Sequence, residues 1–160
     1  MKLKYFWLIF LSILALGAAY WLAAPLFTTK EVHEGIKEIM ETAERSGESG
    51  EEQESETVKS GNFIGADSFH KASGEANILK LGEKYFVRLE DDFSVTNGPD
   101  LFVYFGKNGK YAPEARIGRL KGNIGSQNYE IPANLNPEDY NEIWIWCRAF
   151  SVPFGHAVLI

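Results

Sequence analysis

Residues 142–150 read EIWIWCRAF, and this stretch decides the fold class. Along it, Ile143, Ile145 and Cys147 alternate with two tryptophans and an arginine. A period of two residues is the pattern of a β-strand, because successive side chains of a strand point to opposite faces. The stretch therefore predicts a strand with one aliphatic face and one aromatic face.

Similar alternation recurs elsewhere in the second half of the chain. The strand candidates are residues 74–81, 84–90, 100–106, 117–121, 126–132 and 153–160, with turn-forming Gly, Asn and Pro between them. Many short strands with regular turns and no strong helical pattern are typical of an antiparallel sandwich or barrel. We therefore predict an all-β domain at 61–160, an antiparallel β-sandwich of jelly-roll or immunoglobulin-like type.

An uncharged apolar run, YFWLIFLSILALGAAYWLAA, occupies residues 5–24. A helix of this length would reach across the roughly 30 Å hydrocarbon core of a bilayer. The tyrosines and tryptophans near both ends suit the membrane–water interface. This pattern predicts a signal anchor at 1–28, a single-pass transmembrane helix at about 5–24, and an extracytoplasmic domain on the cell membrane. A signal peptide cleaved near Gly17 is the alternative.

Residues 29–60 contain ten glutamates against four basic residues and join the anchor to the domain. Apolar side chains at helical spacing between 29 and 45 favour a short amphipathic helix. The stretch 46–60 is rich in Gly, Ser and Glu and has almost no large apolar side chains, so it has little surface to bury. We expect 29–60 to form an acidic stalk or linker.

Composition excludes several classes of function. The net charge of −6 and the pI of about 5.1 argue against nucleic acid as a partner. A single cysteine excludes an internal disulfide and an iron–sulfur cluster held by four thiolates. The sequence has no Ser/His/Asp or phosphate-loop motif and no pattern that assigns a metal site. We therefore do not expect a stand-alone enzyme.

Several motifs in the same order resemble those of the DM-thirteen family, small extracellular β domains related to DOMON domains. They are Gly61-Asn62-Phe63, His70 and Gly74, Asp92-Phe93, NGPDLFVY at 97–104, GRLKGNIGSQNY at 118–129, IWIWCR at 143–148 and VPFG at 152–155. The resemblance covers roughly 61–160. It implies a β domain with an accessory role in redox chemistry or electron transfer, and the redox-active cysteine of the family corresponds to Cys147. Since the chain shows no cytochrome module, separate redox partner proteins would supply and accept the electrons.

Cys147 is the main candidate site residue, but two interpretations remain open. A reactive thiol needs exposure and a nearby positive charge or base, whereas Cys147 shares its face with isoleucines, as a core thiol does. His70 is a candidate cofactor ligand, for haem for example, because imidazole is a common axial ligand. His156 would lie near Cys147 if the last two strands pair, and His33 is expected to be solvated.

Other residues have a chemical and a structural interpretation. Trp144 and Trp146 suit electron hopping or a ring-shaped ligand, although strand aromatics more often pack. The aspartates 91, 92 and 100 suit calcium, although loop aspartates usually stabilise turns. The alternative function is a non-enzymatic cell-surface module that binds a polysaccharide, an envelope component or a partner protein. In that case exposed loop aromatics, such as Tyr111 and Tyr140, would form the site.

Overall fold

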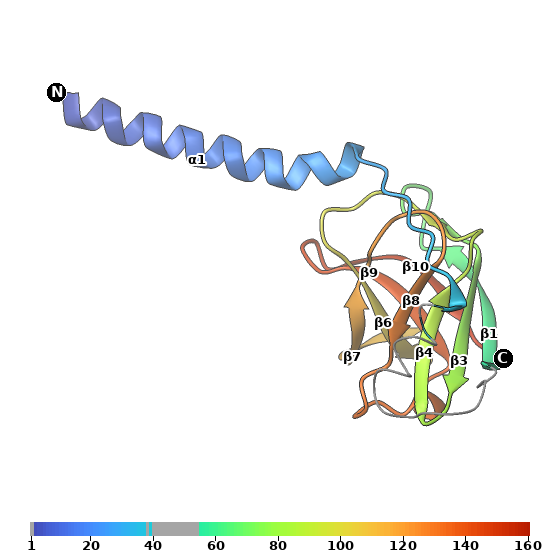
Figure 1. The fold of residues 1–160 in the computed structure, drawn as a ribbon. Coiled ribbons are helices and arrows are strands. Elements are labelled where there is room, and N and C mark those ends of the chain that lie inside the picture. The colour runs from blue at the N-terminus through green and yellow to red at the C-terminus, as the bar shows by residue number, and fades with distance from the viewer. Residues whose placement is uncertain (1, 38, 40–54) are drawn as a thin grey trace.

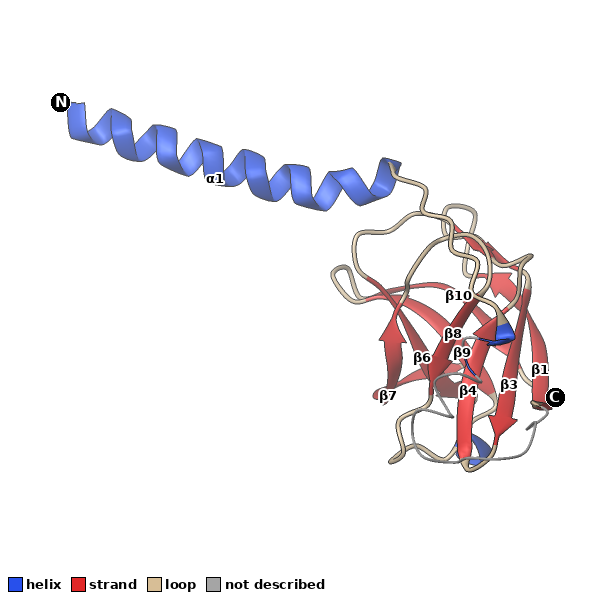
Figure 2. Cartoon of the chain, in the orientation of Figure 1, coloured by secondary structure: helices blue, strands red, loops and turns tan. Residues whose placement is uncertain are grey.

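A computed structural model describes residues 2–37, 39 and 55–160. Within these ranges the chain is mostly β, with one long helix at its N-terminal end (Figure 2). The elements are α1 (Lys2–Phe27), β1 (Glu56–Gly65), β2 (Ala72–Ser73), β3 (Glu75–Leu81), β4 (Lys84–Leu89), β5 (Ser94–Val95), β6 (Leu101–Lys107), β7 (Lys110–Arg119), β8 (Gln127–Glu130), the 3-10 helix η1 (Pro137–Asp139), β9 (Glu142–Cys147) and β10 (Val152–Val158).

Eight of the strands form one antiparallel sheet in the order β7-β6-β9-β10-β1-β3-β4-β8. The sheet curls, and its β6–β9–β10 part faces its β3–β4–β8 part across a shared hydrophobic core (Figure 1). Strands β2 and β5 make a separate two-stranded pairing. The predicted all-β class is confirmed, and the curled sheet is consistent with the predicted sandwich.

Strand β1 connects the two layers of the curled sheet. Its residues 56–62 pair with β3, and its residues 63–65 pair with β10. Close packing of backbone on backbone accompanies this change of partner, because a Cβ atom at Gly61 would overlap the backbone of Val158. Among the described residues, the first strand starts at Glu56, five residues before the domain start expected at 61.

Each of the seven predicted strands has a counterpart in the structure. The runs at 74–81, 84–90, 100–106, 126–132 and 153–160 appear as β3, β4, β6, β8 and β10, with ends shifted by a few residues. Strand β9 ends at Cys147, earlier than 150, because residues 148–151 form the turn into β10. Strand β7 begins at Lys110, seven residues before the predicted start, and β1 was not predicted.

Residues 30–35 are extended and lie against the domain. Val32 N–H donates to the Ile124 carbonyl at 3.0 Å, and the Glu34 carboxylate accepts hydrogen bonds from Lys121 Nζ and the Asn128 backbone at 2.7–2.8 Å. The prediction of a helix beginning at 29 is thus wrong over 30–35, since backbone pairing with the domain replaces helical hydrogen bonds. Ile39 packs with Leu79, Leu81 and Phe86. The rest of the predicted stalk from 40 to 54 lies outside the described residues.

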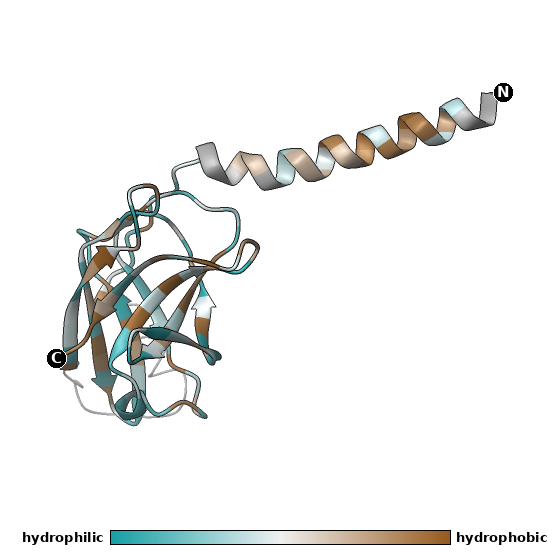
Figure 3. Cartoon of the chain, turned by 180° about the vertical axis from the view of Figure 1, so that it is seen from behind, coloured by the Kyte–Doolittle hydropathy of each residue, from teal (hydrophilic) through white to brown (hydrophobic). Residues whose placement is uncertain are grey.

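Helix α1 extends away from the domain, and most of its length is coloured apolar in Figure 3. The large apolar side chains described between Tyr5 and Trp21 are exposed. Over the part of the chain that the structure describes, however, no helix has the length and hydropathy of a membrane span. The predicted transmembrane helix is therefore not supported by the structure.

Candidate functional site

Strand β9 lies in the sheet between β6 and β10 and carries different side chains on its two faces. Ile143, Ile145 and Cys147 point into the main hydrophobic cluster and are fully buried. Trp144 and Trp146 point to the outer face, where they pack with aromatic side chains of β6 and β7. The alternation read from the sequence is confirmed over 142–147, whereas residues 148–150 belong to the turn into β10.

The thiol of Cys147 is sealed in the core. Its exposed fraction is 0%, and its residue pairs with Leu101 of β6 and Val152 of β10. The neighbouring Arg148 does not turn toward it, because Arg148 Nε donates to Asp100 Oδ2 at 2.9 Å on the exposed side. The structure therefore gives Cys147 the burial of a core thiol.

The outer face of β6, β7 and β9 carries an aromatic layer made of Phe102, Tyr104, Tyr111, Trp144 and Trp146. Tyr111 and Trp146 stack with ring centroids 3.8 Å apart and planes inclined by 19°. Tyr104 meets Tyr111 edge-on at 5.4 Å. Phe102, Tyr104 and Trp144 are buried, whereas Tyr111 and Trp146 are half-buried and reach the surface. In the aromatic layer, the rings of Tyr111 and Trp146 thus reach the surface, and the other three rings pack beneath it.

Polar contacts fix the position of Trp144 within the layer. Its Nε1–H donates to Glu142 Oε2 at 2.8 Å, and Glu142 Oε1 accepts the Gly109 N–H at 2.7 Å. The indole occupies the space above Gly106, where a Cβ atom would overlap it. A buried indole N–H needs an acceptor, and the buried Glu142 provides one.

Arginines cover the Phe102 end of the aromatic layer. The guanidinium carbons of Arg148 and Arg116 lie 4.7 and 5.5 Å from the Phe102 ring centroid, within the range of a cation–π contact. Asp100 binds Arg148 and also lies 3.7 Å from the guanidinium of Arg119. The layer therefore has positively charged groups at its edge.

His70 lies in the loop between β1 and β2, held by Asp67. The two side chains meet at 2.7 Å between Nδ1 and Oδ2, while Oδ1 accepts the backbone N–H groups of Phe69 and His70. The hydrogen bond with the His70 ring, followed by the two backbone bonds, lowers the pKa of Asp67 to about 2. The His70 ring also packs on Phe154 at 4.5 Å.

The remaining titratable candidates are dispersed. His156 stacks on Trp144 at 4.7 Å, so it lies on the face opposite Cys147, and the expected approach of the two does not occur. His33 lies 3.8 Å from Asp91, whose pKa is lowered chiefly by a hydrogen bond from Ser126. Asp92 accepts the Glu75 N–H, and Asp100 binds the arginines. Among the described residues, no group of three or more His, Cys, Asp or Glu side chains is arranged to hold a metal ion.

The two tyrosines proposed as exposed loop aromatics have other roles. Tyr111 belongs to β7 and stacks on Trp146, and Tyr140 stacks on the buried Phe105 with planes inclined by 2°. Sequence reasoning missed Tyr111 as a partner of Trp146. Strand order β7-β6-β9 brings them together, and local alternation carries no information about that order.

The sequence model of the family described as Electron transfer DM13 matches residues 63–159. Neither the search of curated proteins nor that of solved structures returned a match. The matched range spans well over half of the chain and contains β6, β9 and most of the sheet around them. The chain therefore belongs to the Electron transfer DM13 family.

Proposed function

We propose that the protein has an accessory role in electron transfer outside the cytoplasm, with the aromatic layer as its contact with redox partners. Family membership indicates a redox-related role. The observation that carries the proposal is the stack of Tyr111 on Trp146 at 3.8 Å, half-buried at the surface of β7 and β9. Indole and phenol rings are the protein side chains that give up a single electron most readily after thiols.

Cys147 is the proposed redox group behind this stack. It follows Trp146 directly in β9, so a single peptide bond joins the two residues. Its burial argues against thiol–disulfide exchange, because the attacking sulfur of a partner must touch the Sγ atom. The proposed step instead forms a thiyl radical on Cys147. One electron passes through Trp146 to a one-electron acceptor protein that docks on the layer, and the thiol proton passes to a water molecule admitted by local opening of the turn between β9 and β10.

Anchoring in a membrane is a further part of the proposal. It is supported by the uncharged run at 5–24 and by the exposure of the large apolar side chains of α1, which need an apolar cover. Retention of the full chain in membranes through alkaline carbonate extraction tests it. Release into the supernatant would contradict an anchor.

The test of the aromatic contact is the rate of electron exchange between the full chain and a one-electron carrier, measured by stopped flow. Trp146→Phe should slow exchange by roughly tenfold, the effect of raising a barrier by about 1.4 kcal/mol. Trp144→Phe is the matched control, since it changes the same residue type on the same face without removing the stack on Tyr111. Equal rates in the wild type and both variants would contradict the proposal.

The second candidate is a surface module that binds a partner without electron exchange. The exposed Phe69 and Phe150 at loop tips favour it, because exposed aromatic groups often mark contact sites. A polysaccharide site on Tyr111 and Tyr140 is less supported, since both rings are engaged within the domain. Binding of a partner by a chain that exchanges no electrons would favour this candidate.

A further inference from the structure

Several loops and the end of α1 meet at one end of the domain, here called the α1 end. The loops are 66–71, 96–100, 119–123 and 148–151. Backbone hydrogen bonds join them to one another or to adjoining strands, in the pairs Ala66 with Phe154, Thr96 with Lys71, Arg148 with Asp100 and Leu120 with Leu101. The side of the domain nearest α1 in Figure 1 is this end. The C-terminal residues, by contrast, lie at the other end of β10.

Two phenylalanines are exposed at the α1 end. Phe69 in the loop between β1 and β2 is 82% exposed, and Phe150 in the turn between β9 and β10 is 56% exposed. They are the two exposed aromatic side chains among the described residues beyond α1. The turn that carries Phe150 is sharp, since Ser151 has a φ of 54°. Neither ring belongs to a hydrophobic core cluster, so packing within the domain does not account for a phenylalanine at either position.

The connection between α1 and this end is short. Helix α1 ends at Phe27, and the backbone of Lys30 is already bonded to Asn123, whose N–H donates to the Lys30 carbonyl at 3.0 Å. Thr28 and Thr29 alone separate the two, so the gap is at most about 10 Å even when fully extended. Whatever surface α1 enters therefore lies next to the α1 end of the domain.

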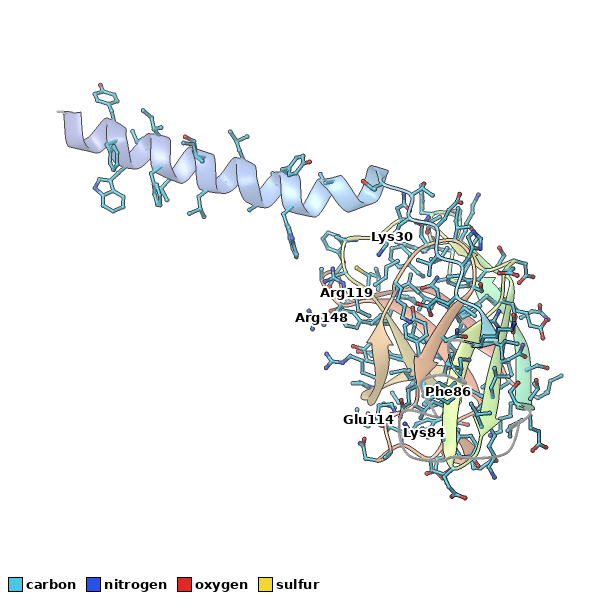
Figure 4. All side chains as sticks on the ribbon, in the orientation of Figure 1. Lys30, Lys84, Phe86, Glu114, Arg119 and Arg148 are labelled. Atoms are coloured by element: carbon cyan, nitrogen blue, oxygen red, sulfur yellow. The ribbon has the colours of Figure 1, made fainter. Side chains whose placement is uncertain are left out.

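Three basic side chains lie on the same end of the domain as Phe150. Lys30, Arg119 and Arg148 lie on the side of the domain toward α1 (Figure 4). Asp100 is shared by the two arginines, and Lys30 has no ion pair with any described residue, so these four groups together carry a net positive charge. A hollow of about 620 Å³ lined by Lys30, Arg119, Gly98 and Leu101 opens between them. Lipid phosphates complement such groups.

Acidic side chains of the same end lie on the β3–β4 side and in the loop of Phe69, where the Asp67 carboxylate bonds His70. Glu75 begins β3, and residues 90–92 follow β4. The charge is therefore divided across the end, with the basic part on the side of β6, β7 and β9. A negatively charged surface would attract the basic part, next to which the turn with Phe150 lies.

We propose that the α1 end docks on a phospholipid bilayer, with Phe69 and Phe150 in the interfacial region and Lys30, Arg119 and Arg148 on lipid phosphates. The inference rests on the proposed membrane anchoring by α1. Aromatic rings favour the bilayer interface, and burying a phenylalanine there removes apolar surface from water. Two such rings, on a domain joined to α1 by a connection of two residues, would hold the domain against the surface.

The experiment uses the full chain in phosphatidylcholine vesicles that contain phosphatidylglycerol and a nitroxide-labelled lipid. Because Cys147 is fully buried, an environment-sensitive fluorophore is attached selectively at Ser68→Cys or Ala149→Cys, next to the two phenylalanines. Asn108→Cys, in the turn between β6 and β7 at the opposite end, is the control position. The nitroxide should quench the labels at 68 and 149 and leave the label at 108 bright.

The double substitution Phe69→Ser and Phe150→Ser should reduce quenching of the labels at 68 and 149 to the level of the control position. Ile160 is an exposed apolar residue of the other end, so Ile160→Ser should leave this quenching unchanged. Labels that stay bright in chains retained through carbonate extraction would overturn the docking surface and leave the anchor standing. Quenching that depends on the phenylalanines in chains that carbonate releases would support docking and overturn the anchor. Chains neither retained nor quenched would overturn both.

Discussion

At the scale of single residues, Cys147 is buried by the same alternation that exposes its neighbour Trp146. Its face of β9 also carries Ile143 and Ile145, all at 0% exposure. In the native full chain we expect the thiol to resist a polar thiol reagent and to react stoichiometrically once the chain is unfolded, because only an accessible sulfur can be attacked. Rapid, complete labelling without denaturant would contradict the buried position.

Gly106 allows Trp144 to lie flat on the sheet. A Cβ atom at this position would overlap the indole ring, so Gly106→Ala should lower the free energy of unfolding by about 1–3 kcal/mol, the usual cost of overpacking. Gly17→Ala is the control, since a Cβ there meets nothing within 4 Å. Urea unfolding monitored by tryptophan fluorescence measures both. An unchanged midpoint for Gly106→Ala would show that the indole lies elsewhere.

Asp67 makes the loop that carries His70 sensitive to acid. Its pKa in the folded chain is about 2, below the ordinary value of 3.8, so its stabilising bonds are complete above pH 3.8 and are lost as the pH falls through about 2. Asp67→Asn should remove the contribution of Asp67 to the pH dependence of the free energy of unfolding between about pH 2 and pH 3.8. Urea unfolding measured at several acidic pH values checks this prediction. If the free energy of unfolding varied with pH equally in the variant and the wild type, the role of Asp67 would be contradicted.

At the scale of elements, the C-terminal residues complete the sheet beside β1. Ser60 and Ile160 exchange two backbone hydrogen bonds at 2.9 and 3.0 Å, and Leu159 is buried in the main core. Removing residues 158–160 should therefore lower the free energy of unfolding by at least about 2 kcal/mol, mostly through the loss of Leu159. Ile160→Ala, at a 93% exposed side chain, is the control and should leave the stability nearly unchanged.

Strands with clear alternation were predictable, and the pairing between them was not. The face of Cys147 follows from the pattern of 142–150, because the period of two is local. Strand β1 escaped prediction because half of it lies in a polar, Glu- and Ser-containing stretch whose order comes from pairing with β3 and β10. The segment 30–35 escaped for the same reason, since Ile124 and Asn128 hold it in an extended form.

At the scale of the whole molecule, the curled sheet places the buried thiol of Cys147 on its inner face and the half-buried pair of Tyr111 and Trp146 on its outer face. The sequence predicted the inner and outer faces, but the contact of Tyr111 with Trp146 depends on the order β7-β6-β9. Docking of residues 30–35 likewise brings the domain close to α1, whereas the composition of 29–60 had suggested a stalk that holds them apart.

Protein-film voltammetry of the full chain and its Cys147→Ala variant tests the redox account most directly. The account predicts a reversible signal from the wild type that disappears in Cys147→Ala and persists in Ile145→Val, a core change on the same buried face that leaves the sulfur in place. A signal of equal size in Cys147→Ala, or none in the wild type, would contradict it.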